Sequence, residues 1–128
     1  MIHGVHLLLY SRDPEADRAF FRDVLDFKFI DAGEGWLIFA LPPAELGIHP
    51  DDGKFVLPHA DQELLGSVIY LMCDNLRETI DSLTAKGVDT TEVLEAGWGI
   101  TTTVRLPSGG GLGLYEPRHP TAILFPQG

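Results

Sequence analysis

The sequence has little cysteine, few basic residues and no long apolar run. Its one cysteine, Cys73, cannot form a disulfide within the chain, which is typical of a protein in a reducing cytoplasm. Nine lysine and arginine residues against 19 acidic ones give a net charge of −10, and such a surface repels the phosphates of nucleic acids and of anionic membranes. No run approaches the roughly 20 apolar residues that span a bilayer, and the first residues lack the pattern of a signal peptide. We therefore expect a cytoplasmic protein that binds neither nucleic acid nor membranes.

The apolar residues that are present follow a pattern that occurs twice along the chain. In each copy a strand-length apolar run precedes a helix, and three further strand-like runs follow it. Asp13, with Pro14 behind it, is predicted to cap the first helix, and Asn75, with Glu78 three residues later, the second. Asp13 and Asp74 open equivalent helices 61 residues apart. The expected strands cover residues 5–11, 27–31, 35–41 and 44–50 in the first copy, and 67–73, 88–94, 97–107 and 111–117 in the second.

This order of elements predicts the α+β class. We expect two tandem β-α-β-β-β modules, about residues 2–50 and 66–118, in a single domain covering residues 1–128. Two curved half-sheets can form one cupped, mixed β-sheet with the helices on the outside, and a concave sheet face is a natural site for a small molecule. Residues 51–65 are expected to form a connecting loop, and loops of that length are often lids.

Three stretches together carry a resemblance to a known family. They are "HLLLYSRDPEADRAFFRDVLDF", "VIYLMCDNLRETIDSLTAKGV" and "RLPSGGGLGLYEP", and their order and spacing resemble the vicinal oxygen chelate superfamily, which includes glyoxalase I, bleomycin-resistance proteins and extradiol dioxygenases. The resemblance covers residues 3 to about 118. It implies the cupped fold, a small organic ligand and a homodimer, with the cup built within one chain or between two. It also implies metal ligands, His or Glu, on inward positions of the first and last strands of each module.

Most of those implied ligand positions are not filled by metal-binding side chains. His6 matches the first position, but the equivalent place in the second module falls on Ser67 or Val68. The carboxylate of the last strand maps onto Gly113, and its counterpart in the first module onto Gly47 or the adjacent Leu46. Transition-metal sites need about three or four donors, so we expect no cofactor; if one is present, the resemblance implies Zn, Ni, Mn or Fe.

A displaced metal site is the alternative. Glu45 and His49 have the same strand parity as Gly47, so both could point into the cup and act with His6. Glu116 has the opposite parity to Gly113 and is expected to face outward, although it too could complete such a set. A neutral His6 or His49 inside the cup could also serve as a general base near pH 7. Without a metal, His6 would simply line the cup.

Side-chain parity also predicts the lining of the cup, which would be mainly apolar and aromatic. A glycine within a strand either allows a bend or lets another group approach closely, and both explanations remain open for Gly47 and Gly113. The predicted lining residues are Leu8, Tyr10, Trp36, Gly47, Val68, Tyr70, Met72, Trp98, Gly113 and Tyr115.

Two functions of different classes follow. The first is a protein that binds a small organic molecule in the cup without the full metal site of the superfamily. The second is a divalent-metal-dependent lyase, isomerase or dioxygenase that acts on a substrate with vicinal oxygens. The small number of metal-binding side chains on inward positions favours the first function. The sequence leaves open whether the protein is an enzyme.

Overall fold

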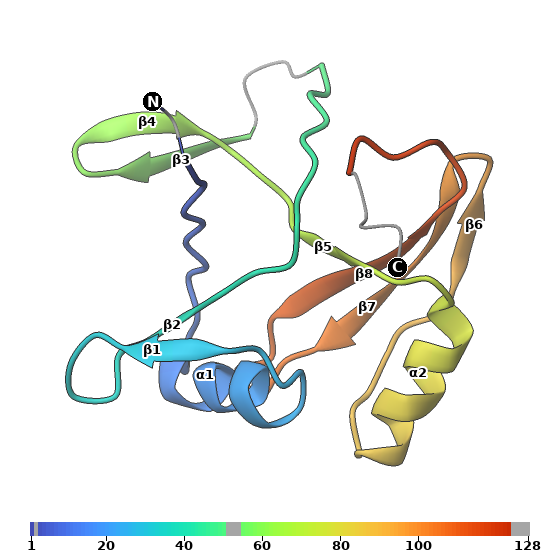
Figure 1. Cartoon of the computed structure of the whole chain (residues 1–128), viewed down its shortest axis with the longest axis horizontal. Coiled ribbons are helices and arrows are strands. Elements are labelled where there is room, and N and C mark those ends of the chain that lie inside the picture. Colours follow the sequence, from blue (N-terminus) through green and yellow to red (C-terminus); the bar gives the residue numbers. More distant parts are fainter. Residues whose placement is uncertain (2, 51–54, 124–128) are drawn as a thin grey trace.

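The computed structural model describes residues 1, 3–50 and 55–123, and it contains both α-helices and β-sheets (Figure 1). The helices are α1 (Pro14–Asp23) and α2 (Leu76–Ala85). The strands are β1 (Phe29–Asp31), β2 (Leu37–Phe39), β3 (Val56–His59), β4 (Gln62–Leu65), β5 (Tyr70–Met72), β6 (Leu94–Ala96), β7 (Gly99–Arg105) and β8 (Gly111–Pro117). The predicted α+β class is confirmed.

Both helices begin where their capping residues predict. An Asp13 carboxylate oxygen accepts a hydrogen bond from the backbone N–H of Ala16 at 3.1 Å, and Pro14 occupies the first turn of α1. The Asn75 side chain accepts from the backbone N–H of Glu78 at the same distance. Local capping chemistry therefore sets both helix starts.

The second module forms one four-stranded sheet in the order β5-β8-β7-β6. Strand β5 runs parallel to β8, and the other two pairs are antiparallel. One face of this sheet packs against α2, because Leu112 and Leu114 of β8 and Val104 of β7 are buried in one core cluster with Leu76 and Leu83 of the helix. The intervening residues of each strand project from the opposite face.

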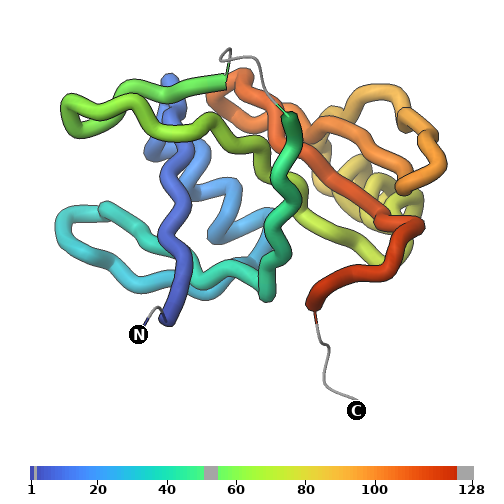
Figure 2. Tube along the Cα trace, turned by 90° about the horizontal axis from the view of Figure 1, so that it is seen from above, coloured from blue at the N-terminus to red at the C-terminus, as the bar shows by residue number. Residues whose placement is uncertain are grey.

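The first module differs from the expectation at two of its strands. Only β1 and β2 pair there, while residues 5–11 and 44–50 are extended without belonging to a strand of the described chain. Their sequences suit a strand, but a strand is completed only when a neighbouring backbone accepts and donates its hydrogen bonds. Figures 1 and 2 both show residues 3–10 and 41–50 running apart from each other.

The expected connecting loop is also partly wrong. Residues 56–65 form the β3–β4 hairpin, while residues 51–54 lie outside the described residues. The two turn residues, Ala60 and Asp61, have φ of +51° and +61°, which is the geometry of a tight hairpin turn. Such turns usually contain Asn-Gly or Asp-Gly, so the sequence Ala60-Asp61 did not indicate a hairpin.

Candidate functional site

The candidate site is the face of the β5-β8-β7-β6 sheet that α2 does not cover. The strand register places Tyr70 beside Gly113, and Gly113 beside Thr103. The next row contains Met72, Tyr115 and Thr101, which lie beside one another in the same way. Paired residues of adjacent strands project to the same side, so tyrosines, a methionine and threonines share this face. The threonines were not among the lining residues predicted from the sequence.

The ring of Tyr70 occupies the space above Gly113. A Cβ atom at position 113 would lie 2.6 Å from Tyr70 Cε1 and 3.1 Å from the backbone oxygen of Ile69. Only glycine leaves room for that ring. Of the two explanations for a glycine here, the structure therefore supports a close approach, and the approaching group is an aromatic ring of the protein itself.

Tyr115 is the centre of an aromatic group that we call the Tyr115 cluster, formed by Tyr70, Trp98, Tyr115 and His119. The ring centroids of Tyr70 and Trp98 lie 5.8 and 5.6 Å from that of Tyr115, both edge to face, and His119 lies 5.8 Å away, tilted. These are favourable aromatic geometries. Tyr70 and Trp98 are still 47% and 54% exposed, so the cluster presents ring surface to solvent.

Polar groups surround one end of the cluster. The Tyr115 hydroxyl donates to the backbone oxygen of Trp98 at 3.1 Å. Burial raises the pKa of Tyr115, and the Glu45 carboxylate raises that pKa further. The hydroxyl is therefore a neutral hydrogen-bonding group at physiological pH.

Glu45 joins the chain segment before β3 to the segment after β8. One Glu45 oxygen accepts from the backbone N–H of Ala122 at 2.8 Å, and the other lies 4.0 Å from His119 Nε2. Glu45 was a candidate from sequence, but His119 was not, because it follows Pro117 outside any periodic pattern. The position of His119 near Glu45 and Tyr115 depends on the tertiary structure, and no local sequence pattern indicates it.

The remaining sequence candidates lie elsewhere in this chain. Trp36 is in the turn between β1 and β2, where the Arg18 guanidinium carbon is 4.4 Å from its ring centroid. Leu8 and Tyr10 are on the exposed segment 3–10, and the Tyr10 hydroxyl hydrogen-bonds His59 Nδ1. The other exposed candidates are His6, Gly47, His49 and Val68.

Glu116 projects toward α2, away from the Tyr115 cluster. Its carboxylate accepts a hydrogen bond from the backbone N–H of Leu76 at 2.8 Å, so it caps the first turn of that helix. The side chain is therefore part of the packing between β8 and α2.

The residues that the structure describes do not fit the metal site that the superfamily implies. Among residues 1, 3–50 and 55–123, no three His, Cys, Asp or Glu side chains are grouped so that they could hold a metal ion. The position equivalent to the last-strand carboxylate is Gly113, and the Tyr70 ring fills the space above it. Glu45 and His119 supply two donors, fewer than a transition-metal site requires.

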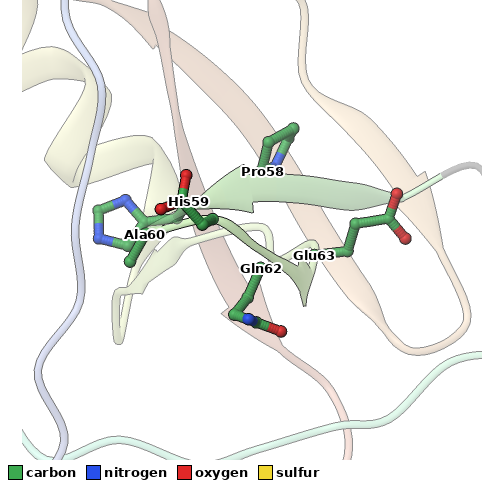
Figure 3. Close-up of a pocket in the computed structure, with 6 residues that line it drawn as sticks. Pro58, His59, Ala60, Gln62 and Glu63 are labelled. Atoms are coloured by element: carbon green, nitrogen blue, oxygen red, sulfur yellow. The ribbon is translucent and has the colours of Figure 1, made fainter.

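Two surface hollows lie away from the Tyr115 cluster. One, of about 400 Å³, is lined only by consecutive residues 58–63 of the β3–β4 hairpin, and Figure 3 shows these side chains pointing in different directions. The other, of about 430 Å³, lies between α1 and the β1–β2 hairpin near Arg18 and Asp31. Polar groups that converge from several elements are typical of a ligand site, and the hairpin hollow lacks them.

The fold and the site define a class: a mixed α+β protein with tandem modules and an aromatic sheet face. The profile described as "Glyoxalase/Bleomycin resistance protein/Dioxygenase superfamily" matches residues 4–109, and the chain belongs to this superfamily. No curated protein matches it. Within the described residues, no helix is long and apolar enough to cross a membrane.

Three solved structures resemble this fold at low sequence identity to the chain. TnmS3, an antibiotic binding protein from Streptomyces sp. CB03234, is 19% identical with a TM-score of 0.57, and the alignment covers 91% of this chain and 99% of that one. Lactoylglutathione lyase from Agrobacterium tumefaciens is 17% identical with a TM-score of 0.56, covering 84% and 88%. A superfamily member from Sphaerobacter thermophilus DSM 20745 is 22% identical with a TM-score of 0.54, covering 90% and 98%.

Proposed function

We propose that the protein binds a small organic molecule with a planar, unsaturated part against the Tyr115 cluster. The observation that carries the proposal is the ring of Tyr70 above Gly113, at the position where the superfamily places a metal-binding carboxylate. An aromatic ring cannot chelate an ion, but it offers a flat surface for stacking. The Tyr115 hydroxyl and the Glu45–His119 pair supply polar groups that could orient the ligand.

The charge of the chain limits the kind of ligand. With a net charge of −10, the protein repels anions and attracts cations over distances of about one Debye length, ~8 Å at physiological salt. Glu45 also adds a carboxylate beside the cluster. We therefore propose a neutral or cationic ligand, bound in the cytoplasm.

The second candidate is a divalent-metal-dependent lyase, isomerase or dioxygenase. Membership of the superfamily and the likeness to a lactoylglutathione lyase favour it. It requires donors from outside the Tyr115 cluster, because the described residues supply too few there.

The two tryptophans provide a matched test of the binding site. Trp36→Phe leaves Trp98 as the one tryptophan, and Trp98→Phe leaves Trp36, which stacks with Arg18 in a different part of the chain. Three naphthalene probes serve as ligands: 2-naphthol (neutral), 1-naphthylmethylamine (cationic) and naphthalene-1-sulfonate (anionic). We expect the first two to change the tryptophan fluorescence of Trp36→Phe, and to leave that of Trp98→Phe almost unchanged.

Affinity gives the second readout. Tyr115→Ala should weaken probe binding by roughly two- to tenfold, because one aromatic contact is worth about 0.5–1.5 kcal/mol. Equal fluorescence responses from the two single-tryptophan variants, or tighter binding of the sulfonate than of the amine, would contradict the proposal.

A further inference from the structure

The hollow between α1 and the β1–β2 hairpin has no part in the proposed function. It measures about 430 Å³ and lies between residues 15–22 of the helix and residues 29–37 of the hairpin, which Figure 1 shows beside each other; we call it the α1 hollow. Sites for small molecules have volumes of about 300–1,000 Å³ and combine apolar walls with a few polar groups. The α1 hollow has this size, and both elements contribute charged side chains to it.

The pairing of β1 with β2 accounts for an apolar floor in the α1 hollow. Phe29 pairs with Phe39. Asp31 pairs with Leu37, so all four side chains project from the same face of the hairpin. That face is turned toward α1, because the ring centroids of Phe39 and Phe21 lie 5.7 Å apart. Phe29 is 43% exposed and Leu37 is half-buried, so both offer apolar surface to a ligand.

Arg18 supplies a fixed cation on the helix side of the α1 hollow. Its guanidinium carbon lies 4.4 Å from the ring centroid of Trp36, and this stacking holds the group in place. Among the residues that the structure describes, none accepts a hydrogen bond from Arg18 or pairs with its charge. Arg22 differs, because Asp23 accepts from both its Nε and its Nη2, at 2.7 and 2.8 Å. Arg18 can therefore bind a carboxylate through two N–H groups.

Asp31 supplies a fixed anion on the hairpin side. Its Oδ1 accepts hydrogen bonds from the backbone N–H groups of Gly33 at 2.8 Å and Gly35 at 3.2 Å, so the turn orients the carboxylate. Its Oδ2 lies 3.3 Å from the same Gly35 nitrogen and can accept a further donor. Glu15 and Glu34 add two more carboxylates to the lining. These groups repel a simple anion, while a simple cation leaves the stacked guanidinium unpaired.

We infer that the α1 hollow is a second ligand site, which binds a zwitterionic amino acid with an apolar side chain. The carboxylate of the ligand pairs with Arg18, its ammonium group with Asp31, and its side chain lies on Phe29 and Leu37. Such a ligand has no net charge, so the net charge of −10 does not repel it. The site is made by the first module alone, and the inference does not rest on the proposed function.

Three phenyl compounds test the need for both charges. L-phenylalanine carries both, phenethylamine lacks the carboxylate and 3-phenylpropanoate lacks the ammonium group. In calorimetric titrations of the native chain, we expect L-phenylalanine to bind at least about tenfold more tightly than either of the others, because each lacks one hydrogen bond between charged groups. L-phenylalanine should also change the fluorescence of Trp98→Phe, whose remaining Trp36 stacks with Arg18, and should leave that of Trp36→Phe unchanged.

Two variants assign the charges to their side chains. Arg18→Gln should weaken the binding of L-phenylalanine by about tenfold and leave that of phenethylamine unchanged, since the amine has no carboxylate for Arg18 to bind. Asp31→Asn should weaken the binding of L-phenylalanine to a similar extent and leave that of 3-phenylpropanoate unchanged. The unchanged probe in each case reports that the variant is folded. Arg77→Gln removes the same charge from the exposed surface of α2, and as the control it should bind L-phenylalanine like the native chain.

Three results would overturn the inference. They are L-phenylalanine that does not bind, or binds no more tightly than the other two compounds; an equal loss of affinity in Arg77→Gln and Arg18→Gln; and a fluorescence change confined to Trp36→Phe. A chain that binds L-phenylalanine as expected but none of the naphthalene probes supports this inference and contradicts the proposed function. The opposite pair of results contradicts this inference and supports the proposed function.

Discussion

The contact between Gly113 and Tyr70 determines the chemistry of the candidate site. In a strand, position 113 would normally project a side chain from the same face as Tyr115. Glycine removes that side chain, and the Tyr70 ring fills the space. Strand parity alone predicted that these three residues share a face. It could not predict that one of them covers another, because that depends on side-chain rotamers across two strands.

Gly113 and Gly47 give a matched pair of substitutions at the residue scale. Gly113→Ala should destabilise the protein by about 1–3 kcal/mol, because the new Cβ would overlap the Tyr70 ring and approach the Ile69 carbonyl. Gly47→Ala should change stability by no more than about 0.5 kcal/mol, since nothing lies within 4 Å of a Cβ there. Urea unfolding followed by circular dichroism measures both.

A double-mutant cycle isolates the contact with the ring. Adding Tyr70→Ala to Gly113→Ala should recover part of the lost stability, because the overlapping ring is then absent. Two results would show that the Tyr70 ring does not occupy the space above Gly113. One is an equal loss of stability in Gly113→Ala and Gly47→Ala. The other is a double variant in which the effects of Gly113→Ala and Tyr70→Ala simply add.

At the scale of elements, α1 of the first module contacts the second module through a buried carboxylate, in addition to the apolar contacts of Phe20 and Phe21 in the shared core. Asp17 accepts hydrogen bonds from the Ser11 hydroxyl at 2.6 Å, from the Ser108 hydroxyl at 2.7 Å and from the Ser108 backbone N–H at 3.0 Å. Ser108 lies in the turn between β7 and β8. The two hydrogen bonds from Ser108 join residues 91 positions apart in the chain.

Asp17→Ala should lower the free energy of unfolding by about 1–3 kcal/mol, since it leaves half-buried donors of Ser108 and Ser11 without their acceptor. Asp23→Ala on the same helix is the control. Its exposed carboxylate pairs with Arg22 beside it, and water screens an exposed ion pair so that it contributes little to stability. In urea titrations, Asp17→Ala should therefore lower the free energy of unfolding more than Asp23→Ala does. An equally large loss in the two variants would refute the role of Asp17.

The elements also show what could be predicted from the sequence. The helix starts at Asp13 and Asn75 were predictable because capping involves neighbours along the chain. The strands expected at 5–11 and 44–50 depend on a distant partner, and the described chain does not supply one. The β3–β4 hairpin was missed because its Ala60-Asp61 turn lacks the usual glycine.

At the scale of the whole molecule, the net charge limits the kind of ligand, and the two modules present different surfaces. The acidic surface favours neutral or cationic ligands. The second module carries the Tyr115 cluster, while many large apolar side chains of the first module are exposed. The superfamily could be identified from the order of motifs over most of the chain, whereas the position of His119 beside Tyr115 required the tertiary structure.

The central claim is that aromatic side chains, and not a bound metal ion, hold the ligand. Calorimetric titration of 2-naphthol into protein dialysed against EDTA tests it most directly. We predict the same affinity before and after addition of Zn, Ni, Mn or Fe, an unchanged affinity for His6→Ala, and a two- to tenfold weaker one for Tyr115→Ala. Binding that requires an added metal, disappears in His6→Ala and survives in Tyr115→Ala would contradict the account.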